Sequence, residues 1–537
     1  MSPAQADDVS FEQLLQRLQQ TEQRVRDLEQ QQATPFLPAS FADEKRAPLI
    51  PPPIDEETSA KKPADEKKEE AKSGSQEAGD QDKEDKDKKD DKEKEPTFED
   101  RLKKLEKGWK ELDEAWGDFE KAEAKKKADA AKKPTLKING RIHADYWNFI
   151  DDNGGVGFFE NPLNGGGPAA TLGADPEDRF AFRRIRLEMS GDCLETMLWR
   201  IQVDFNKPAE AEIKDVYIGF KELPGNQTLL IGNQKRPIGL DHLNSSRYNI
   251  FLERPMVIEA FNEDARRPGI CTYGHTDDES LIWAYGMYYL ESLNTSGQTL
   301  GDQRQMSGNA RLAGSPWYDE SSGGRGYYHW GLSGMIAKPD GNDTASDFQD
   351  NEGRFRTRPE ARSTNRWMDT GRIRGADWYE TIGIEQMFNV GPLQITGEYL
   401  HNFMQRDGFS DVQFHGGYVY VSYMLTGEHV PYERDSGTLG RLQPFENFFL
   451  VDRCGGGHGC GWGAWGVAAR YSYLDLSNAD ILGGVGESAT LALNWYWTAY
   501  SKMQFNLIYG DIHDRNPAVG ATHGNYLIAG TRLAIEF

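Results

Sequence analysis

The sequence predicts an all-β transmembrane β-barrel of about 16 antiparallel strands, preceded by an N-terminal α-helical coiled-coil and disordered extension. After residue 134, apolar and polar residues alternate with a period of two in about fifteen segments, as they do in strands with one lipid-facing side. The last segment, Asn525 to Phe537, ends on an aromatic residue and keeps its two charges, Arg532 and Glu536, on one face. Long polar segments also alternate with very short turns, an asymmetry that a soluble sandwich does not need.

The bulk composition excludes several classes of protein. The sequence contains no run of ~18 apolar residues, which excludes a helical membrane span. The net charge of -24 argues against nucleic acid as a partner. The sequence has no Gly-x-Ser-x-Gly motif, no His-Glu-x-x-His motif and no phosphate-binding glycine loop. We therefore expect neither an enzyme nor a cofactor; a barrel enzyme with catalytic carboxylates or histidines on its loops is a minor alternative.

The chain divides by composition into four parts. Residues 1–32 carry a short heptad pattern, and residues 33–96 are rich in Pro, Lys, Asp and Glu, which predicts a disordered charged linker. Residues 97–133 predict a second coiled-coil helix, and residues 134–537 predict the barrel. The apolar heptad positions of the second helix are Phe98, Leu102, Leu105, Trp109, Leu112, Trp116 and Phe119. They favour oligomerisation, and the alternative is an amphipathic helix that packs against its own domain.

Counting alternating segments leaves one strand of the barrel unaccounted for, because barrels of this kind have an even number of strands. We expect the missing strand near Asn447 to Asp452, in the stretch NFFLVD. Two long polar segments, at about Glu291 to Arg325 and Lys338 to Gly375, are assigned to loops.

Arginines form the candidate functional set, because a guanidinium stays ionised and its planar fork matches phosphate oxygens. Those that alternation predicts to face the lumen are Arg141, Arg184, Arg186, Arg200, Arg470 and Arg532. The segment from Arg236 to Arg267 has no strand period and predicts a loop folded into the lumen, with Arg236, Arg247, Arg254, Arg266 and Arg267. Each loop arginine either selects anions or braces the loop through a neighbouring carboxylate, and the sequence leaves both interpretations open.

Several segments resemble the phosphate-selective porin O and P family: FRRIRLEMSGD, IGNQKRPIGLDHLNSSRYNIFLERP, GYVYVSYMLTGE, GAWGVAARYSYLDL, LNWYWT and RLAIEF. They occur in the expected order between about residues 135 and 537. The resemblance implies a trimeric sixteen-stranded barrel that conducts anions across the outer membrane past an infolded constriction loop. In members with strong phosphate preference the constriction carries lysines, whereas the counterpart here has arginines near Asp241, Glu253, Glu259, Glu263 and Asp264.

We therefore expect passive diffusion of small anions, such as phosphate or polyphosphate, through an arginine-lined lumen in the bacterial outer membrane. The expected partners are small anions, outer-membrane lipid and two further copies of the chain in a homotrimer. The N-terminal extension is expected to lie in the periplasm. One alternative is a general diffusion porin with weak ion selectivity, which admits small neutral solutes. Another is a protein that tethers the outer membrane to the cell wall through its N-terminal helices.

The cysteines predict one covalent link. Cys454 and Cys460 bracket the stretch CGGGHGC, which predicts a disulfide in an extracellular loop. The alternative is a metal site that uses His458, but two cysteines and one histidine make an incomplete ligand set. We expect no metal, and Cys193 and Cys271 are left unassigned.

Overall fold

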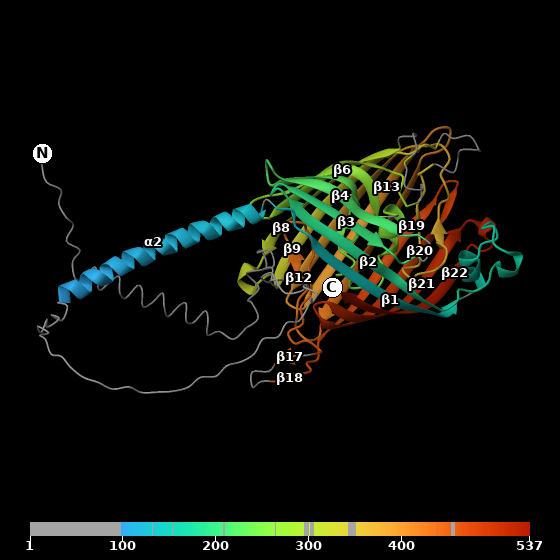
Figure 1. Ribbon diagram of the computed structural model, residues 1–537. Helices are drawn as coiled ribbons and strands as arrows, with labels where there is room; N and C mark the ends of the chain where they lie inside the picture. The colour runs from blue at the N-terminus through green and yellow to red at the C-terminus, as the bar shows by residue number, and fades with distance from the viewer. Residues whose placement is uncertain are drawn as a thin grey trace, which may run out of the picture. The chain divides into compact units, whose positions relative to one another are not determined.

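The computed structural model describes residues 98–131, 133–152, 154–207, 210–263, 265–294, 300, 305–341, 351–449, 451–452 and 457–537. Sixteen strands form one closed barrel in which each strand pairs with its neighbours in the sequence and the last pairs with the first (Figure 1). The pairings are antiparallel. Because β22 pairs with β1, the sheet has no open edge to present to lipid. The predicted fold class is confirmed.

The barrel strands are β1 (Lys137–Asp152), β2 (Arg179–Cys193), β3 (Met197–Asp204), β4 (Glu212–Leu223), β5 (Gln227–Lys235), β6 (Arg266–His275), β7 (Leu281–Tyr289), β8 (Met306–Tyr318), β9 (Gly326–Lys338), β12 (Ala376–Val390), β13 (Leu393–Arg406), β14 (Val412–Met424), β19 (Ala464–Asn478), β20 (Ile481–Thr498), β21 (Ser501–Arg515) and β22 (Gly524–Glu536). Short two-stranded sheets in the connections are β10 (Arg356–Thr357) with β11 (Met368–Asp369), β15 (Tyr432–Glu433) with β16 (Thr438–Leu439), and β17 (Val451–Asp452) with β18 (His458–Gly459). The helices are α2 (Phe98–Ala131), α3 (Gly154–Glu160), α4 (Leu240–Leu243) and α5 (Met256–Phe261).

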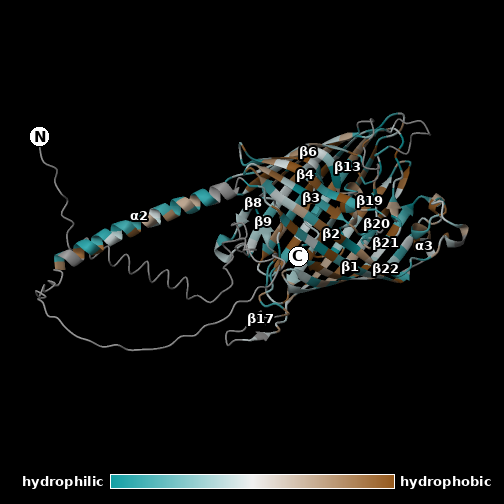
Figure 2. Cartoon of the chain, in the orientation of Figure 1, coloured by the Kyte–Doolittle hydropathy of each residue, from teal (hydrophilic) through white to brown (hydrophobic). Residues whose placement is uncertain are grey.

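Alternation along the strands separates an apolar outer wall from a polar inner wall. In β22, Leu533 and Ile535 are exposed on the outside, whereas Arg532 is buried inside the barrel. Figure 2 shows hydrophobic and hydrophilic residues alternating along the strands of the barrel wall. Aromatic rings gather on the outside near the ends of β19 and β20, where Trp465 stacks on Trp495 at 4.8 Å between ring centroids. Such rings are typical of the membrane interface.

The barrel strand missing from the sequence count is β8. The expectation of a barrel strand near Asn447 to Asp452 is wrong, because the short strand β17 in that stretch pairs with β18 and not with the barrel. The stretch from Glu291 to Arg325, predicted to be a loop, contains β8. The outward positions of this strand include Gly308 and Ala310, so between Met306 and Trp317 only Leu312 gives that side of the strand a large exposed apolar residue. Small residues hide the alternation, although pairing with β7 and β9 is regular over most of the strand.

The two ends of the barrel differ in the length of their connections. One end, here called the turn end, carries Lys137, Glu536 and short turns such as the one between Val390 and Leu393. The opposite end is here called the loop end, and two long connections fold into the lumen from it. Residues 236–263 are called the infolded loop, and residues 351–375 are called the second loop. At the turn end the connection from Met424 to Ala464 is long, and its part 430–442, the turn-end hairpin, folds into the lumen as well. The predicted infolded loop is therefore present, together with two further infolded segments.

The apolar core of the protein lies inside the barrel, where these segments pack on the inner wall. Trp147, Leu240, Leu252, Met256 and Trp367 are all completely buried and belong to one continuous cluster. Trp147 therefore faces the inside of the barrel. Its neighbour Tyr146 is exposed on the outer face. The infolded loop occupies part of the lumen as a packed element and not as a mobile strand of chain.

The backbone of the infolded loop is hydrogen-bonded to side chains of the barrel wall. The amides of Leu240 and Asp241 each donate to a carboxylate oxygen of Glu398 at 2.7 Å. The carbonyls of the same loop accept from five wall residues: Lys502 and Gln504 at Asn249, Arg532 at Leu252, Arg470 at Glu253, and Lys235 at Leu243 and Asn244. Buried backbone groups need such partners, so these bonds fix the loop against β5, β13, β19, β21 and β22.

Helix α2 covers the region predicted to form the second coiled coil. Its heptad residues remain solvent-exposed, Phe98 at 79% and Leu105 at 72%. The pairing of this helix with other copies stays a prediction. The first heptad segment (1–32) and the charged linker (33–96) lie outside the described residues.

Three of the four cysteines lie in the described residues. Cys193 and Cys271 are free thiols, and Cys460 forms no disulfide with either of them. Cys454 lies outside the described residues, so a Cys454–Cys460 disulfide stays a prediction. The connection from Met424 to Ala464 that would carry it belongs to the turn end of the barrel, where β1 begins and β22 ends. The location of this disulfide on the extracellular side stays a prediction.

Replacing Glu398 by Ala should destabilise the barrel, because it leaves the buried amides of Leu240 and Asp241 without an acceptor. Each unsatisfied amide costs about 1–3 kcal/mol. Urea unfolding in detergent micelles, followed by tryptophan fluorescence, measures the effect. Glu380→Ala is the matched control, since Glu380 lies on the outer face of β12, and it should change stability by less than about 0.5 kcal/mol. Equal stabilities of the two variants would contradict the anchoring role.

Candidate functional site: an arginine-lined cavity

A cavity of about 480 Å³ lies between the inner wall of β1–β8, the infolded loop and the turn-end hairpin, and is here called the main cavity. Nine basic residues line it: Arg141, Arg184, Arg186, Arg200, Lys235, Arg247, Arg254, Arg266 and Arg311. Only three acidic residues do so: Glu188, Asp215 and Asp435. The lining therefore has a clear excess of positive charge, although the whole chain is acidic.

A β-bulge in β2 concentrates basic residues on the inner wall. The register pairs Arg184 with His143 and Phe182 with Ala144, so Arg183 is an extra residue without a partner on β1. Arg183 and Arg184 both reach groups inside the barrel, Glu253 and His143 respectively. Bulges re-aim side chains in this way.

The sequence analysis missed Arg183 because strict alternation places it on the outside. A signal was nevertheless present. The exposed apolar residues of β2 shift from even positions, Phe180 and Phe182, to an odd position, Leu187, across the Arg183–Arg184 pair. A change of phase within one strand predicts a bulge at the point of change.

Most of the predicted arginines are bound to carboxylates. Arg186 contacts Asp204 at 2.6 Å, Arg266 forms two hydrogen bonds to Asp215, and Arg254 contacts Asp241 at 3.1 Å. Longer contacts join Arg200 to Glu188 at 3.4 Å and Arg247 to Glu536 at 3.7 Å. Their charges are largely compensated, as the bracing interpretation anticipates.

Two of the strand arginines brace the infolded segments from the far wall. Arg532 contacts both Asp145 and Glu253, and Arg470 contacts Glu360 at 2.6 Å. Glu360, on the second loop, also accepts hydrogen bonds from Ser488 and Thr490. Arg470 and Arg532 are absent from the lining of the main cavity and hold the loops in place.

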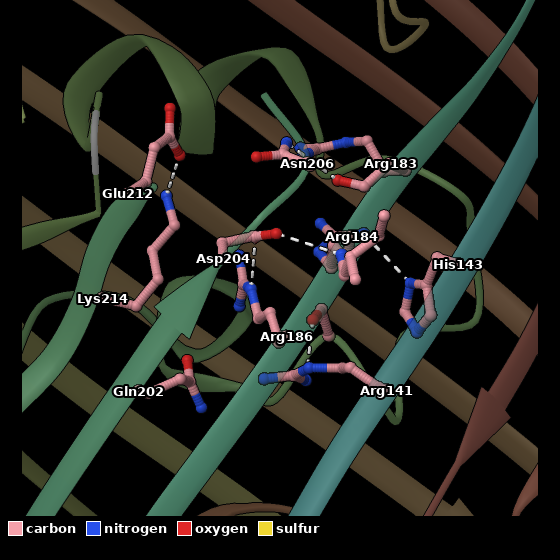
Figure 3. A network of polar contacts seen from close by, with 12 residues as sticks. Arg141, His143, Arg183, Arg184, Arg186, Gln202, Asp204, Asn206, Glu212 and Lys214 are labelled. Carbon is pink, nitrogen blue, oxygen red and sulfur yellow. Dashed lines mark hydrogen bonds and ion pairs between the residues drawn. The ribbon is translucent and has the colours of Figure 1, made fainter. Parts of the chain in front are cut away.

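Arg141 and Arg184 differ from the other arginines of the main cavity because no carboxylate in the described part of the chain lies within ion-pairing distance of them. Arg141 donates to the hydroxyls of Ser245 and Ser246, and the Nη1 of Arg184 lies 3.3 Å from the Nδ1 of His143. Both side chains are almost fully buried, at 3% and 2% exposure. The Nε of each has no hydrogen-bond partner. Figure 3 shows the two arginines on neighbouring strands, with Arg186 and its partner Asp204 beside them.

The remaining two predicted residues, Arg236 and Arg267, lie at a separate space. They line a cavity of about 100 Å³ with Arg354, Arg356 and Arg372 of the second loop. Arg236 contacts the sulfur of Met335, and Arg267 donates to the carbonyl of Leu290. The role of the eleven arginines in selectivity, with those of the Arg236–Arg267 segment at the narrowest part of the pore, stays a prediction.

The infolded loop carries a carboxylate among these arginines. Burial by itself raises the pKa of Glu253, but the guanidiniums of Arg183 and Arg184 hold the pKa of Glu253 well below its ordinary value. On the second loop, repulsion by Arg183, together with burial and Arg358, lowers the pKa of Arg362 to about 9. Both groups are therefore charged at neutral pH.

A closed barrel with loops folded into a polar lumen is the architecture of an outer-membrane porin. None of the helices in the described residues is both long and apolar enough to cross a bilayer. A family model, phosphate-selective porin O and P, matches residues 170–537. The chain belongs to that family.

The chain is also similar to individual proteins. A protein of Caulobacter vibrioides with no assigned function is 25% identical over 361 residues, 66% of this chain and 68% of its own length. Among solved structures, the anion-selective porin from Comamonas acidovorans is 12% identical with a TM-score of 0.44, covering 75% of this chain and 100% of its own. The DcaP channel of Acinetobacter baumannii is 11% identical with a TM-score of 0.43, covering 75% and 98%. Identities this low say nothing about what this chain conducts.

The ion pairs of Glu253 should make stability depend on pH. Because its pKa is lower in the folded than in the unfolded state, its stabilising contribution is present above the ordinary pKa of about 4.3 and is lost as pH falls below it. Glu253→Gln should therefore weaken the barrel at pH 7 and flatten the loss of stability between about pH 5 and pH 2. A pH series of urea midpoints measures this. Glu195→Gln, in an exposed turn, is the control and should leave the slope unchanged.

Proposed function

We propose that the protein lets small anions, phosphate among them, diffuse passively across the outer membrane through the arginine-lined side of its lumen. The supporting observation is the pair Arg141 and Arg184, buried beside the main cavity without a carboxylate partner in the described residues. A buried guanidinium without a carboxylate at ion-pairing distance is only partly compensated by more distant charges such as Glu253, which is unfavourable. A passing anion supplies the missing countercharge, so the same groups lower the barrier for anions and raise it for cations.

The acidic net charge of the chain does not oppose this function. Charges on exposed loops and on the N-terminal part are screened by salt over a Debye length of about 8 Å. Charges on an inner wall, next to a poorly polarisable protein interior, act on a permeating ion with much less screening. The excess of basic groups at the cavity therefore decides the sign of the ions that pass.

A general diffusion porin with weak ion selectivity is the second candidate. The observation that favours it is the carboxylate pairing of Arg186, Arg254 and Arg266, which removes most of their field from the lumen. Under this alternative, neutral solutes pass as readily as anions. Conduction in either case requires that binding be weak enough for release, so phosphate specificity is not part of the proposal.

The assembly that fits this function is a homotrimer in the outer membrane, with the N-terminal part on the periplasmic side. The apolar stripe of α2 supports it, because seven large apolar side chains at heptad positions remain exposed on a single chain. Lipid covers the outer wall of the barrel, where aliphatic residues such as Leu332 and Ile384 are exposed.

Replacing Arg141 and Arg184 by Ala together should reduce anion selectivity. Loss of two inner-wall charges should lower the anion-to-cation permeability ratio by about tenfold, which corresponds to about 1.4 kcal/mol. Reversal potentials of single channels in a potassium chloride gradient measure the ratio. Arg179→Ala is the matched control, because Arg179 lies on the same strand as Arg184 but pairs with Glu160 away from the cavity. A wild-type reversal potential of cation sign would refute the anion channel.

Replacing Leu105 and Leu112 of α2 by Glu should weaken the trimer, because charge enters the apolar stripe. The expected result is a lower dissociation temperature in detergent, measured by native electrophoresis of heated samples. The control is Lys104→Glu with Lys110→Glu, which changes charge on the same helix away from the heptad positions. If both variants dissociate at the wild-type temperature, α2 takes no part in assembly.

A further inference from the structure

The main cavity has two chemically different sides. Its basic side is formed by β1–β3 and the infolded loop, with Arg141, Arg184 and Arg200. On the other side, β5, β6 and β7 contribute Leu230, Tyr273, Ile282 and Ala284, here called the apolar side. These are inward positions of a barrel wall, where most other strands carry polar residues.

Each cation that strands β5 to β8 contribute to the cavity lining already has a partner among the described residues. Lys235 donates to the carbonyls of Leu243 and Asn244, and Arg266 is bound to Asp215. Arg311 pairs in register with Ala284, but its guanidinium is bound to Glu385 at 2.6 Å and to the carbonyl of Gly437 at 3.0 Å. The hydroxyl of Tyr273 is engaged with the carbonyl of Lys235. Ring and hydrocarbon surfaces are therefore what this side presents to the cavity.

The volume of about 480 Å³ also exceeds the requirement of one inorganic anion. A hydrated inorganic ion gains nothing from hydrocarbon surface, whereas a ligand with a hydrocarbon part gains about 0.8 kcal/mol per buried methylene. Cavities of about 300–1,000 Å³ that combine apolar surface with a few fixed polar groups are typical of sites for organic molecules. A cavity with positive charge on one side and hydrocarbon on the other suits a ligand with an anionic group, here called the head, and a hydrocarbon part, here called the tail.

We propose that the main cavity binds organic monoanions, carboxylates or sulfonates that carry a short aliphatic chain or one aromatic ring. The head lies at Arg141 and Arg184, and the tail lies against Leu230, Tyr273 and Ile282. The inference rests on the proposed anion conduction and adds the class of solute.

The turn-end hairpin favours a ligand with one negative charge over a ligand with two. Asp435, at the tip of the hairpin, is exposed and lines the cavity. Gly437, two residues after Asp435, lies so close to Ile282 that a Cβ on this glycine would meet the Cδ1 of Ile282 at 2.2 Å. A second carboxylate at the far end of a dianion would therefore approach Asp435, and like charges repel.

The test compares anions with the same head and different tails. Acetate, butyrate, hexanoate and adipate are added to single channels of the full-length protein in planar bilayers, and their constants for block of the chloride current are measured. Hexanoate should block at about tenfold lower concentration than acetate, because part of its four additional methylenes is buried. Adipate, of the same chain length, should block more weakly than hexanoate.

Two variants connect the effect to the cavity. Leu230→Ser with Ile282→Ser should reduce the hexanoate-to-acetate ratio to about twofold while chloride conductance persists, which also reports that the barrel has folded. Asp435→Asn changes only an exposed residue and should bring the block by adipate close to that by hexanoate. Ile270→Ser is the control, since Ile270 lies on the outer face of β6, and it should leave all constants unchanged.

The outcomes separate the two proposals. Equal block by acetate and hexanoate in an anion-selective wild-type channel overturns the inference about solute class and leaves anion conduction standing. A tail dependence that survives in the Leu230 and Ile282 variant also overturns it. A cation-sign reversal potential without block by any of these anions overturns the proposed function itself.

Discussion

The lumen depends on the hydrogen bonds between the backbone of the infolded loop and the barrel wall. Glu398, Arg470, Gln504 and Arg532 accept from or donate to that backbone, and all four belong to strands β13–β22. Most of these bonds hold the loop against one half of the barrel, and on the opposite side Lys235 of β5 donates to the carbonyls of Leu243 and Asn244. The other half, β1–β8, keeps free inner surface, and the main cavity lies there.

The position of the loop also decides which arginines keep an unsatisfied charge. A carboxylate that reaches an arginine turns it into a brace, and Asp204, Asp215 and Glu253 do this for their neighbours. Arg141 and Arg184 lie where serine hydroxyls and a histidine are the neighbouring polar groups. A buried pair resists change, since removal of either partner leaves the other charge without compensation. An arginine without a carboxylate can be replaced at lower cost to the fold.

The sequence determines most of the barrel through local pattern, because the side-chain period of a strand does not depend on its neighbours. Alternation indicated the direction of Arg186 and Arg532 correctly, and it failed for β8, where Gly308 and Ala310 leave little contrast between the two sides. It also failed for Arg183, because a bulge is a relation between two strands. The sequence does not distinguish arginines that are bound to carboxylates of the protein from arginines that could bind a passing anion. The partner of Arg532 at Asp145 is 387 positions away, and only the closure of β1 on β22 brings the two together.

The long connection at the turn end begins and ends on adjacent strands. β14 and β19 are paired from His415 to Met424 and from Gly466 to Asp475, without an irregularity in the register. A two-residue turn joins the similar pair β12 and β13. The barrel wall therefore closes without any contribution from the segment that reaches into its mouth. Such a segment is an exchangeable module: a filter of different length or chemistry can be inserted between the same two strands, and the scaffold that surrounds it stays the same.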